Sequence, residues 1–129
     1  MKLRYLDRWT AERRMLAKFY DTLLDPNFCT FPEIGEKCLS NYHLYPIRVK
    51  NRDSLQRYLG KRGVQTHVHY PLPVYRQEAV TSWYRGLFLP EAERHAREVL
   101  SLPIYPELKK SDVVFITNQV NRFFKNHAN

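Results

Sequence analysis

The predicted fold of the chain is organised around residues 64–75, VQTHVHYPLPVY. His67 and His69 alternate with Thr66, Val68 and Tyr70, which predicts a strand that carries both imidazoles on one face. Two prolines follow at once and cannot donate to a ladder, so we expect the strand to end near Tyr70. The sequence therefore predicts a strand end at which two histidines and a tyrosine reach a polar ligand.

Size and composition predict one folded domain over residues 1–129, with 43% hydrophobic and 14% aromatic residues. The formal charge of +8 favours an anionic partner, whether nucleic acid, a phosphate-bearing small molecule or an acidic protein surface. No apolar run approaches a membrane span and no secretion signal is visible, so we expect a soluble cytoplasmic protein without a membrane partner. Cys29 and Cys38 fit neither a metal motif nor a disulfide framework, which predicts two reduced thiols.

Hydrophobic periodicity and capping residues predict seven elements along the chain. They are a helix over 2–24, a strand over 41–49, a helix capped by Asn51 or Asp53, the strand before the prolines, a helix from Pro90 to Leu100, a short extended piece over 101–104, and a helix capped by Ser111. This order predicts an α+β fold, with a small, mainly antiparallel sheet and helices packed on one face. Because the first helix begins without a cap, we expect that the chain has lost a preceding part. Helices on one face leave the other face of the sheet uncovered, and a second domain could cover it.

Two binding functions have weaker support in the residues. His67 and His69 could chelate a metal with His43 or a cysteine, but no spaced carboxylate or cysteine pair completes the set, so hydrogen-bonded strand histidines are favoured and no metal site is predicted. Several tyrosines and a basic first helix could contact single-stranded nucleic acid. The positive charges are scattered and no RNA-binding signature is present, so a solvated basic surface is favoured and nucleic acid is not the expected partner.

Catalytic motifs are missing from the sequence. There is no Gly-x-Ser-x-Gly elbow, and neither cysteine has a recognisable reactive context. Glu91, Glu93 and Glu98 lie beside arginines on one predicted helix, where a solvated charged face explains them. The residues alone indicate a binding surface, with no catalytic, cofactor-binding or metal-binding residue.

Several short motifs recur in an order and spacing that match a known family. They are residues 42–45 (YHLY), 63–73 (GVQTHVHYPLP), Gln77, residues 92–94 (AER) and residues 100–108 (LSLPIYPEL). With these motifs the chain resembles, from about residue 3 to about residue 124, the C-terminal domain of the DegT/StrS family of sugar aminotransferases. These are pyridoxal-phosphate (PLP) enzymes of the aspartate-aminotransferase fold, fold type I.

The resemblance implies a reaction and a set of substrate-binding residues. In that family an amino group moves from glutamate or glutamine, through PLP, to a nucleotide-linked keto-sugar used for surface polysaccharides, lipopolysaccharide or glycosylated metabolites. The family's HYP-type stretch lies near the active site at a homodimer interface and helps to hold the nucleotide-sugar, which points to His69 and Tyr70 here, and secondarily to Tyr42 and His43. Tyr75 departs from the family, in which many relatives carry histidine, so the sugar stays undefined.

The family's large N-terminal domain is absent from this sequence. The lysine that forms a Schiff base with PLP and the aspartate that pairs with the pyridine nitrogen belong to that domain. We therefore expect that the chain neither binds PLP nor transaminates alone, that its partner is the large domain in cis or as a separate chain, and that its uncovered apolar surface causes self-association. The alternative is a stand-alone, non-catalytic interaction module that binds a nucleotide-sugar, a partner protein or nucleic acid.

Overall fold

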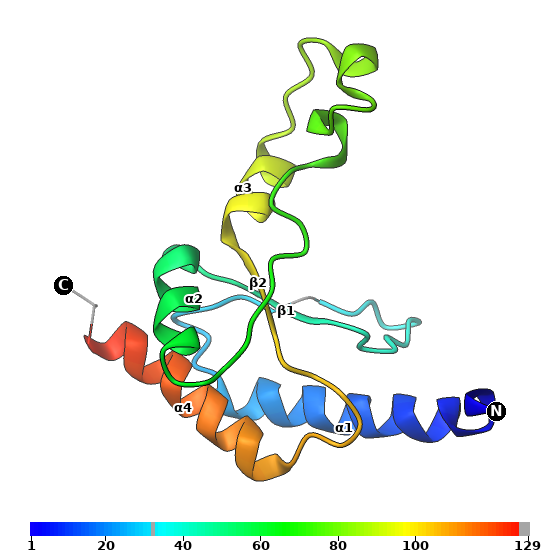
Figure 1. Cartoon of the computed structure of the whole chain (residues 1–129), viewed down its shortest axis with the longest axis vertical. Coiled ribbons are helices and arrows are strands. Elements are labelled where there is room, and N and C mark those ends of the chain that lie inside the picture. The colour runs from blue at the N-terminus through cyan, green and yellow to red at the C-terminus, as the bar shows by residue number, and fades with distance from the viewer. Residues whose placement is uncertain (32, 127–129) are drawn as a thin grey trace.

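The computed structural model of the chain describes residues 1–31 and 33–126 (Figure 1). Its elements, in order, are the 3-10 helix η1 (Lys2–Tyr5), α1 (Leu6–Leu23), β1 (Tyr45–Arg48), α2 (Arg52–Gly60), the 3-10 helices η2 (Val74–Arg76) and η3 (Thr81–Tyr84), α3 (Pro90–Glu98), β2 (Val99–Leu102) and α4 (Lys110–Asn126). None of the helices in these described ranges has the length and apolar character that a bilayer crossing requires.

The two strands form a small antiparallel sheet, as the sequence predicted. The register pairs Tyr45 with Leu102 and Arg48 with Val99. Isolated bridges extend the sheet by one residue on each side, from Thr30 to Arg48 and from His67 to Ser101. The α+β class is confirmed, with helices packed against a small sheet.

The predicted strand before the prolines does not form, and this prediction was wrong. Residues 64–70 are extended but pair with β2 only through His67, whose backbone exchanges two hydrogen bonds with Ser101, at 3.2 and 2.7 Å. A ladder would next need the backbone of Val99 and Pro103, two residues to either side.

Both of those positions are already occupied. The Val99 N–H donates to the His95 carbonyl, and its own carbonyl accepts the Arg52 guanidinium at 3.3 Å. Pro103 has no N–H, and its carbonyl accepts the Tyr20 hydroxyl at 2.9 Å. Pairing along the outer edge of β2 is therefore confined to Ser101.

Pro46 sits inside β1, and the register shows no bulge there. Its partner across the sheet is Ser101, whose N–H and C=O both point to His67. In an antiparallel pair, a residue whose backbone groups point to one side forms a non-hydrogen-bonded pair on the other side. Pro46 therefore occupies a position that needs no donor.

The first helix is buried only along its second half. Leu16, Ala17 and Tyr20 are buried, whereas Leu3 and Leu6, at the start of the same predicted stripe, are exposed. The helix over 2–24 is confirmed, with one 3-10 turn, η1, at its beginning.

The other helices differ little from the prediction. α3 ends at Glu98, two residues early, because Val99 and Leu100 join β2. The buried face predicted for α4 is confirmed, with Val113, Ile116, Val120 and Phe123 all in the core. Asn51 stands at the start of α2, but its side chain makes no capping hydrogen bond.

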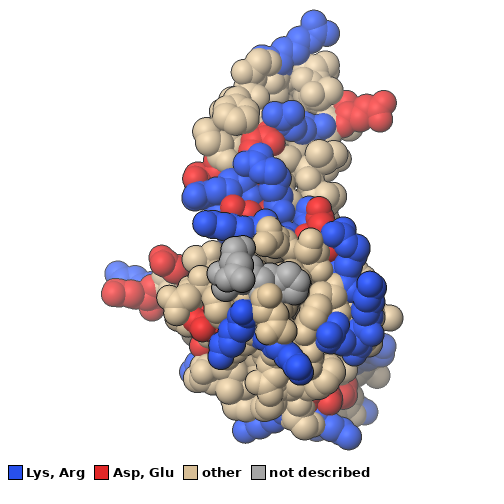
Figure 2. Space-filling model, turned by 90° about the vertical axis from the view of Figure 1, so that its left-hand side faces the viewer, with Lys and Arg blue, Asp and Glu red and all other residues tan. Residues whose placement is uncertain are grey.

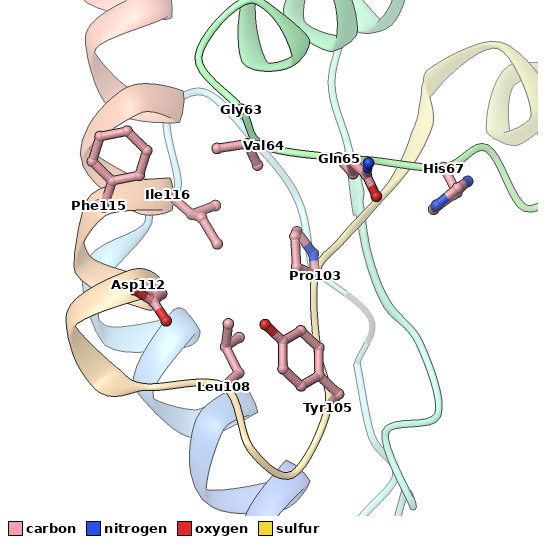
Figure 3. Close-up of a pocket in the computed structure, with 10 residues that line it drawn as sticks. All are labelled: Gly63, Val64, Gln65, His67, Pro103, Tyr105, Leu108, Asp112, Phe115 and Ile116. Carbon is pink, nitrogen blue, oxygen red and sulfur yellow. The ribbon is translucent and has the colours of Figure 1, made fainter.

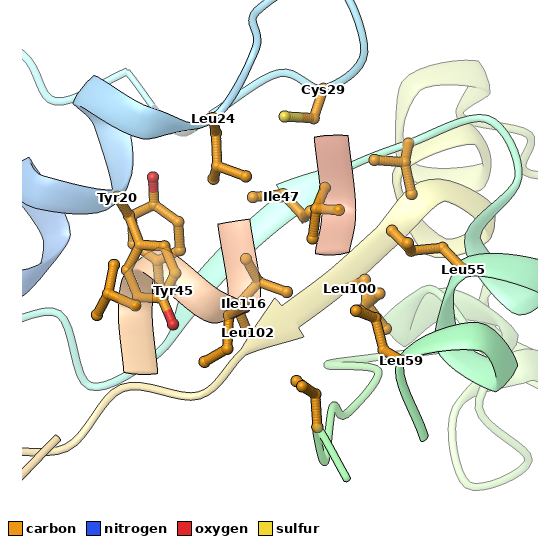
Figure 4. Close-up of a cluster of buried hydrophobic side chains, with 14 of the residues drawn as sticks. Tyr20, Leu24, Cys29, Tyr45, Ile47, Leu55, Leu59, Leu100, Leu102 and Ile116 are labelled. Carbon is orange, nitrogen blue, oxygen red and sulfur yellow. The ribbon is translucent and has the colours of Figure 1, made fainter. Parts of the chain in front are cut away.

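One hydrophobic core joins α1, α2, α4 and the inner face of the sheet (Figure 4). The rings of Tyr20 and Tyr45 stack with centroids 4.6 Å apart, and the Tyr45 hydroxyl donates to Asp21 at 2.6 Å. Burial raises the pKa of Tyr45 above its usual value, and the bond to Asp21 raises it further. Ile47 and Leu100, from opposite strands, are fully buried in the same core.

An arm formed by residues 71–89 projects away from this body, with η2 and η3 as its only helical turns in the described chain (Figure 1). It begins directly after Tyr70 and returns to the body at α3. Its exposed large apolar side chains are Leu72, Val74, Trp83, Tyr84, Leu87, Phe88 and Leu89. Side chains of this kind are normally buried, so the arm presents an unusually apolar surface.

Candidate functional site

His69 is fixed to the sheet by a buried serine. Its Nδ1 lies 3.0 Å from the Oγ of Ser101, and Ser101 is only 4% exposed. A hydrogen bond at one ring nitrogen sets the orientation of an imidazole and leaves Nε2 for another partner. The sequence identified His69, whereas Ser101 was assigned only to a short extended piece.

Tyr70, the residue after His69, is exposed. Its side chain is 67% exposed, and its ring meets that of His69 edge-on, with centroids 5.5 Å apart. One hydrogen-bonding imidazole and one phenol therefore stand side by side where the chain leaves the body. The two residues are consecutive in the sequence, so their proximity is local.

His67 shares a face with His69, as the alternation predicted. The two ring centroids are 5.9 Å apart. Within residues 1–31 and 33–126, no group of three or more histidine, cysteine, aspartate or glutamate side chains is placed to hold a metal ion. The same-face prediction is confirmed.

Tyr42 and His43 lie elsewhere, in the bend that precedes β1. Tyr42 has a positive φ of 45° and packs its ring on Tyr45, with centroids 6.4 Å apart. Desolvation by burial raises the pKa of Tyr42, and the charge of Asp21 raises it further. The His43 side chain is exposed. No hydrogen bond or ring contact joins either residue to His69 or Tyr70 within the described ranges.

A polar cluster holds the two ends of the arm together. Tyr75, only 8% exposed, donates its hydroxyl to the carboxylate of Glu93, and Arg76 donates to the same carboxylate. The Leu89 N–H donates to the Tyr75 hydroxyl at 3.2 Å. The bond from Tyr75, followed by that from Arg76, lowers the pKa of Glu93. The sequence placed Glu93 on a solvated face, because nothing in its local pattern reveals a partner 18 residues away.

An open groove of about 500 Å³ lies between residues 63–67, residues 103–108 and α4 (Figure 3). Val64, Leu108 and Ile116 make much of its wall apolar, while Asp112 and His67 add polar groups. Figure 3 shows the Asp112 carboxylate and the Tyr105 hydroxyl pointing toward the open space between the two walls.

The groove lacks the features of a PLP site. PLP-dependent transamination requires a lysine held against the cofactor in an enclosed pocket. Among the residues that the structure describes, no lysine lines the groove. Every lysine of the chain is exposed, namely Lys2, Lys18, Lys37, Lys50, Lys61, Lys109, Lys110 and Lys125. The residues that line the groove therefore do not fit the cofactor, and Lys50 and Lys61 line two other hollows of the surface.

Basic side chains are dispersed over the surface. Figure 2 shows Lys and Arg on both the arm and the body, with acidic side chains among them on that face. Some are paired, as Arg48 is with Glu98 at 2.8 Å. A dispersed arrangement of this kind is typical of a solvated surface.

Comparison with known proteins gives one consistent result. The family model described as the DegT/DnrJ/EryC1/StrS aminotransferase family matches residues 1–121. A pleiotropic regulatory protein of Geobacillus stearothermophilus is 37% identical over 99% of the chain and 36% of its own length. The dTDP-3-amino-3,6-dideoxy-alpha-D-galactopyranose transaminase of Aneurinibacillus thermoaerophilus is 35% identical over 95% of the chain and 34% of its own length.

A solved structure shows the same fold. The crystal structure of DesV from S. venezuelae, in complex with a ketimine intermediate, superimposes with a TM-score of 0.87 at 33% identity, over 95% of this chain and 33% of that one. The chain thus spans about a third of the length of the relatives it matches.

Proposed function

The chain belongs to the DegT/DnrJ/EryC1/StrS aminotransferase family, and from this premise we propose that it is the small domain of a PLP-dependent sugar aminotransferase. The complete enzyme moves an amino group from glutamate or glutamine to a nucleotide-linked keto-sugar. The observation that carries the proposal is the match to a dTDP-sugar transaminase over 95% of the chain. PLP supplies the electron sink for the transfer when it is bound in the complete enzyme.

His69 and Tyr70 hold the nucleotide-sugar in this proposal. Both lie within the residues that the family model matches. His69 has Nε2 left for a ligand because Nδ1 is engaged by Ser101, and Tyr70 offers an exposed hydroxyl beside it. A pyrophosphate is an acceptor of hydrogen bonds, so these two groups and the basic charge of +8 suit it chemically. Tyr42 and His43 are secondary candidates, since they lie apart from this pair.

The other parts of the complete enzyme come from outside this chain. We place the PLP-binding lysine on a large domain, joined in cis or supplied as a separate chain, and the complete enzyme is a homodimer. The exposure of every lysine supports this division. The cytoplasm is the proposed location. The alternative from the sequence, a stand-alone interaction module, remains a prediction that an adjacent reading frame for the large domain would contradict.

The test is a titration of the 129-residue chain with dTDP and UDP, monitored through the NMR signals of the histidine and tyrosine rings. We expect the His69 and Tyr70 signals to shift with saturation, and His69→Ala to weaken binding by about 1–3 kcal/mol, the cost of one hydrogen bond to a charged group. His95→Ala is the matched control, since His95 is exposed on α3. Equal nucleotide binding by both variants would show that His69 does not contact the nucleotide.

A further inference from the structure

The segment over residues 69–75 is held at both of its ends. At the first end, Nδ1 of His69 meets the buried Ser101 at 3.0 Å. At the second end, the ring of Tyr75 is buried and its hydroxyl is bonded to Glu93. Between these two anchors Tyr70, Leu72 and Val74 are exposed, and Tyr70 is the one of the three that carries a polar side-chain group.

The connection between the anchors is stiff. Pro71 and Pro73 fix their own φ angles, and Pro73 has the polyproline II values of −59° and 149°. The chain bends at Pro71 and Leu72, so it is not a straight rod, but the two fixed φ angles leave few backbone torsions free between the anchors. A displacement of Tyr75 is therefore transmitted toward Tyr70 rather than absorbed between them.

The hydroxyl of Tyr75 has its bonding capacity engaged inside the protein. It donates its single proton to the Glu93 carboxylate and accepts the Leu89 N–H at 3.2 Å. Arg76, the next residue, binds the same carboxylate. The first turn of the arm, η2, is thereby tied to the start of α3, where the arm ends. We call Tyr75, Arg76, Leu89 and Glu93 the clasp.

We propose that Tyr75 is a positioning residue, whose hydroxyl closes the clasp and thereby fixes Tyr70 at the substrate edge without touching the nucleotide-sugar itself. The substrate role of Tyr70 rests on the proposed function. The anchoring of residues 69–75 does not, because it follows from the bonds of the clasp and of His69 alone.

The charges around Glu93 determine how the clasp responds to pH. Arg76 and Arg97 face its carboxylate as positive charges, and Tyr75 donates to it. They keep the pKa of Glu93 below its usual value, although desolvation opposes them. A carboxyl with a lowered folded pKa contributes stability above its unfolded pKa and loses it as the pH falls through the folded pKa. The clasp is thus intact at neutral pH and weakens in acid.

The experiment is amide hydrogen exchange on the 129-residue chain, expressed as protection factors with the α4 amides as internal reference. Tyr75→Phe keeps the ring and removes the hydroxyl. We expect it to lower the protection of the Leu89 amide, and of its neighbours in the arm, by roughly three- to tenfold, the effect of one hydrogen bond. Tyr84→Phe is the matched control in the same arm and should change nothing, because the Tyr84 hydroxyl makes no hydrogen bond within the described residues.

Glu93→Gln supplies a second, independent variant. The amide oxygen of glutamine still accepts from Tyr75, so protection at neutral pH should remain near that of the parent chain. The parent chain should lose arm protection as the pH falls, and Glu93→Gln should lose this acid-dependent step. This pH profile tests whether Glu93 holds the clasp, and the ring signals of Tyr70 test separately whether the clasp positions Tyr70.

Two results would contradict the proposed role of the clasp: unchanged arm protection in Tyr75→Phe, or an acid-dependent loss of protection that persists in Glu93→Gln. A shift of the Tyr70 ring signals in Tyr75→Phe is expected, and unmoved signals would refute the transmission to Tyr70. The proposed function fails separately. Absence of nucleotide binding, with the protection pattern as predicted, would refute the substrate role and leave the clasp standing.

Discussion

The imidazole of His69 and the hydroxyl of Ser101 meet at 3.0 Å, across 32 residues of sequence. Ser101 is also the one residue of β2 that pairs with the extended chain before the prolines. The same serine thus fixes both the backbone of His67 and the ring of His69. The orientation of the candidate site is set by a short strand of the core.

Ser101→Ala should uncouple His69 from the sheet without unfolding the domain. We expect the free energy of unfolding to fall by about 1 kcal/mol, because one largely buried hydrogen bond is lost and alanine leaves little empty space. Denaturant unfolding measures the loss. Ser82→Ala, at an exposed position in η3, is the control and should be neutral. A loss no greater than that of the control would show that the bond to His69 contributes nothing.

The two cysteines should differ sharply in reactivity. Cys29 is buried, and burial raises the pKa of its thiol to about 12, with the charge of Asp25 adding to the effect. Cys38 is exposed. Since the thiolate is the reactive form, iodoacetamide at pH 8 should label Cys38 alone in the folded protein. Mass mapping checks the site, and Cys38→Ser should abolish labelling. Labelling of Cys29 before unfolding would contradict the buried position.

The stability of the domain should be most sensitive to substitutions in the core where the two strands face the helices. Leu100 is fully buried, so Leu100→Ala should destabilise the domain by about 2–5 kcal/mol through the cavity it leaves. The matched control is Leu72→Ala in the arm, where leucine is half exposed. Thermal and denaturant unfolding give both values. Similar losses for the two variants would show that β2 is not the centre of the core.

The exposed apolar surface should cause self-association at high concentration. The exposed arm residues Trp83 and Phe88 and the exposed start of α1, with Leu3 and Leu6, offer surfaces that another protein part can bury. Light scattering should show a concentration-dependent mass, and Trp83→Ser with Phe88→Ser should reduce it. A strictly monomeric chain that binds no hydrophobic dye would refute this prediction.

Local patterns predicted the helices because each signal lies within a few residues. The stripes of α1 and α4 and Pro90 at the start of α3 depend on neighbours three or four residues apart. The failed strand over residues 64–70 depends on distant groups instead. Arg52 and Tyr20 occupy the backbone sites that a ladder would need, and neither is visible from the strand pattern.

In the candidate site, too, local features were predicted and distant contacts were not. The alternation correctly placed His67 and His69 on one face. The partners that fix the site, Ser101 for His69 and Glu93 for Tyr75, lie 32 and 18 residues away. Such contacts are set by how the elements pack, so a single sequence does not reveal them.

As the proposed small domain of an aminotransferase, this chain should depend on a large domain for its chemistry. The most direct measurement combines PLP titration and borohydride trapping with an amino-transfer assay on dTDP- and UDP-linked keto-sugars. The chain is tested alone and together with a separately expressed large domain. We predict no stoichiometric labelling of a single lysine and no turnover by the chain alone, and turnover when the large domain is added. Stoichiometric labelling of one lysine with turnover by the isolated chain would contradict the account.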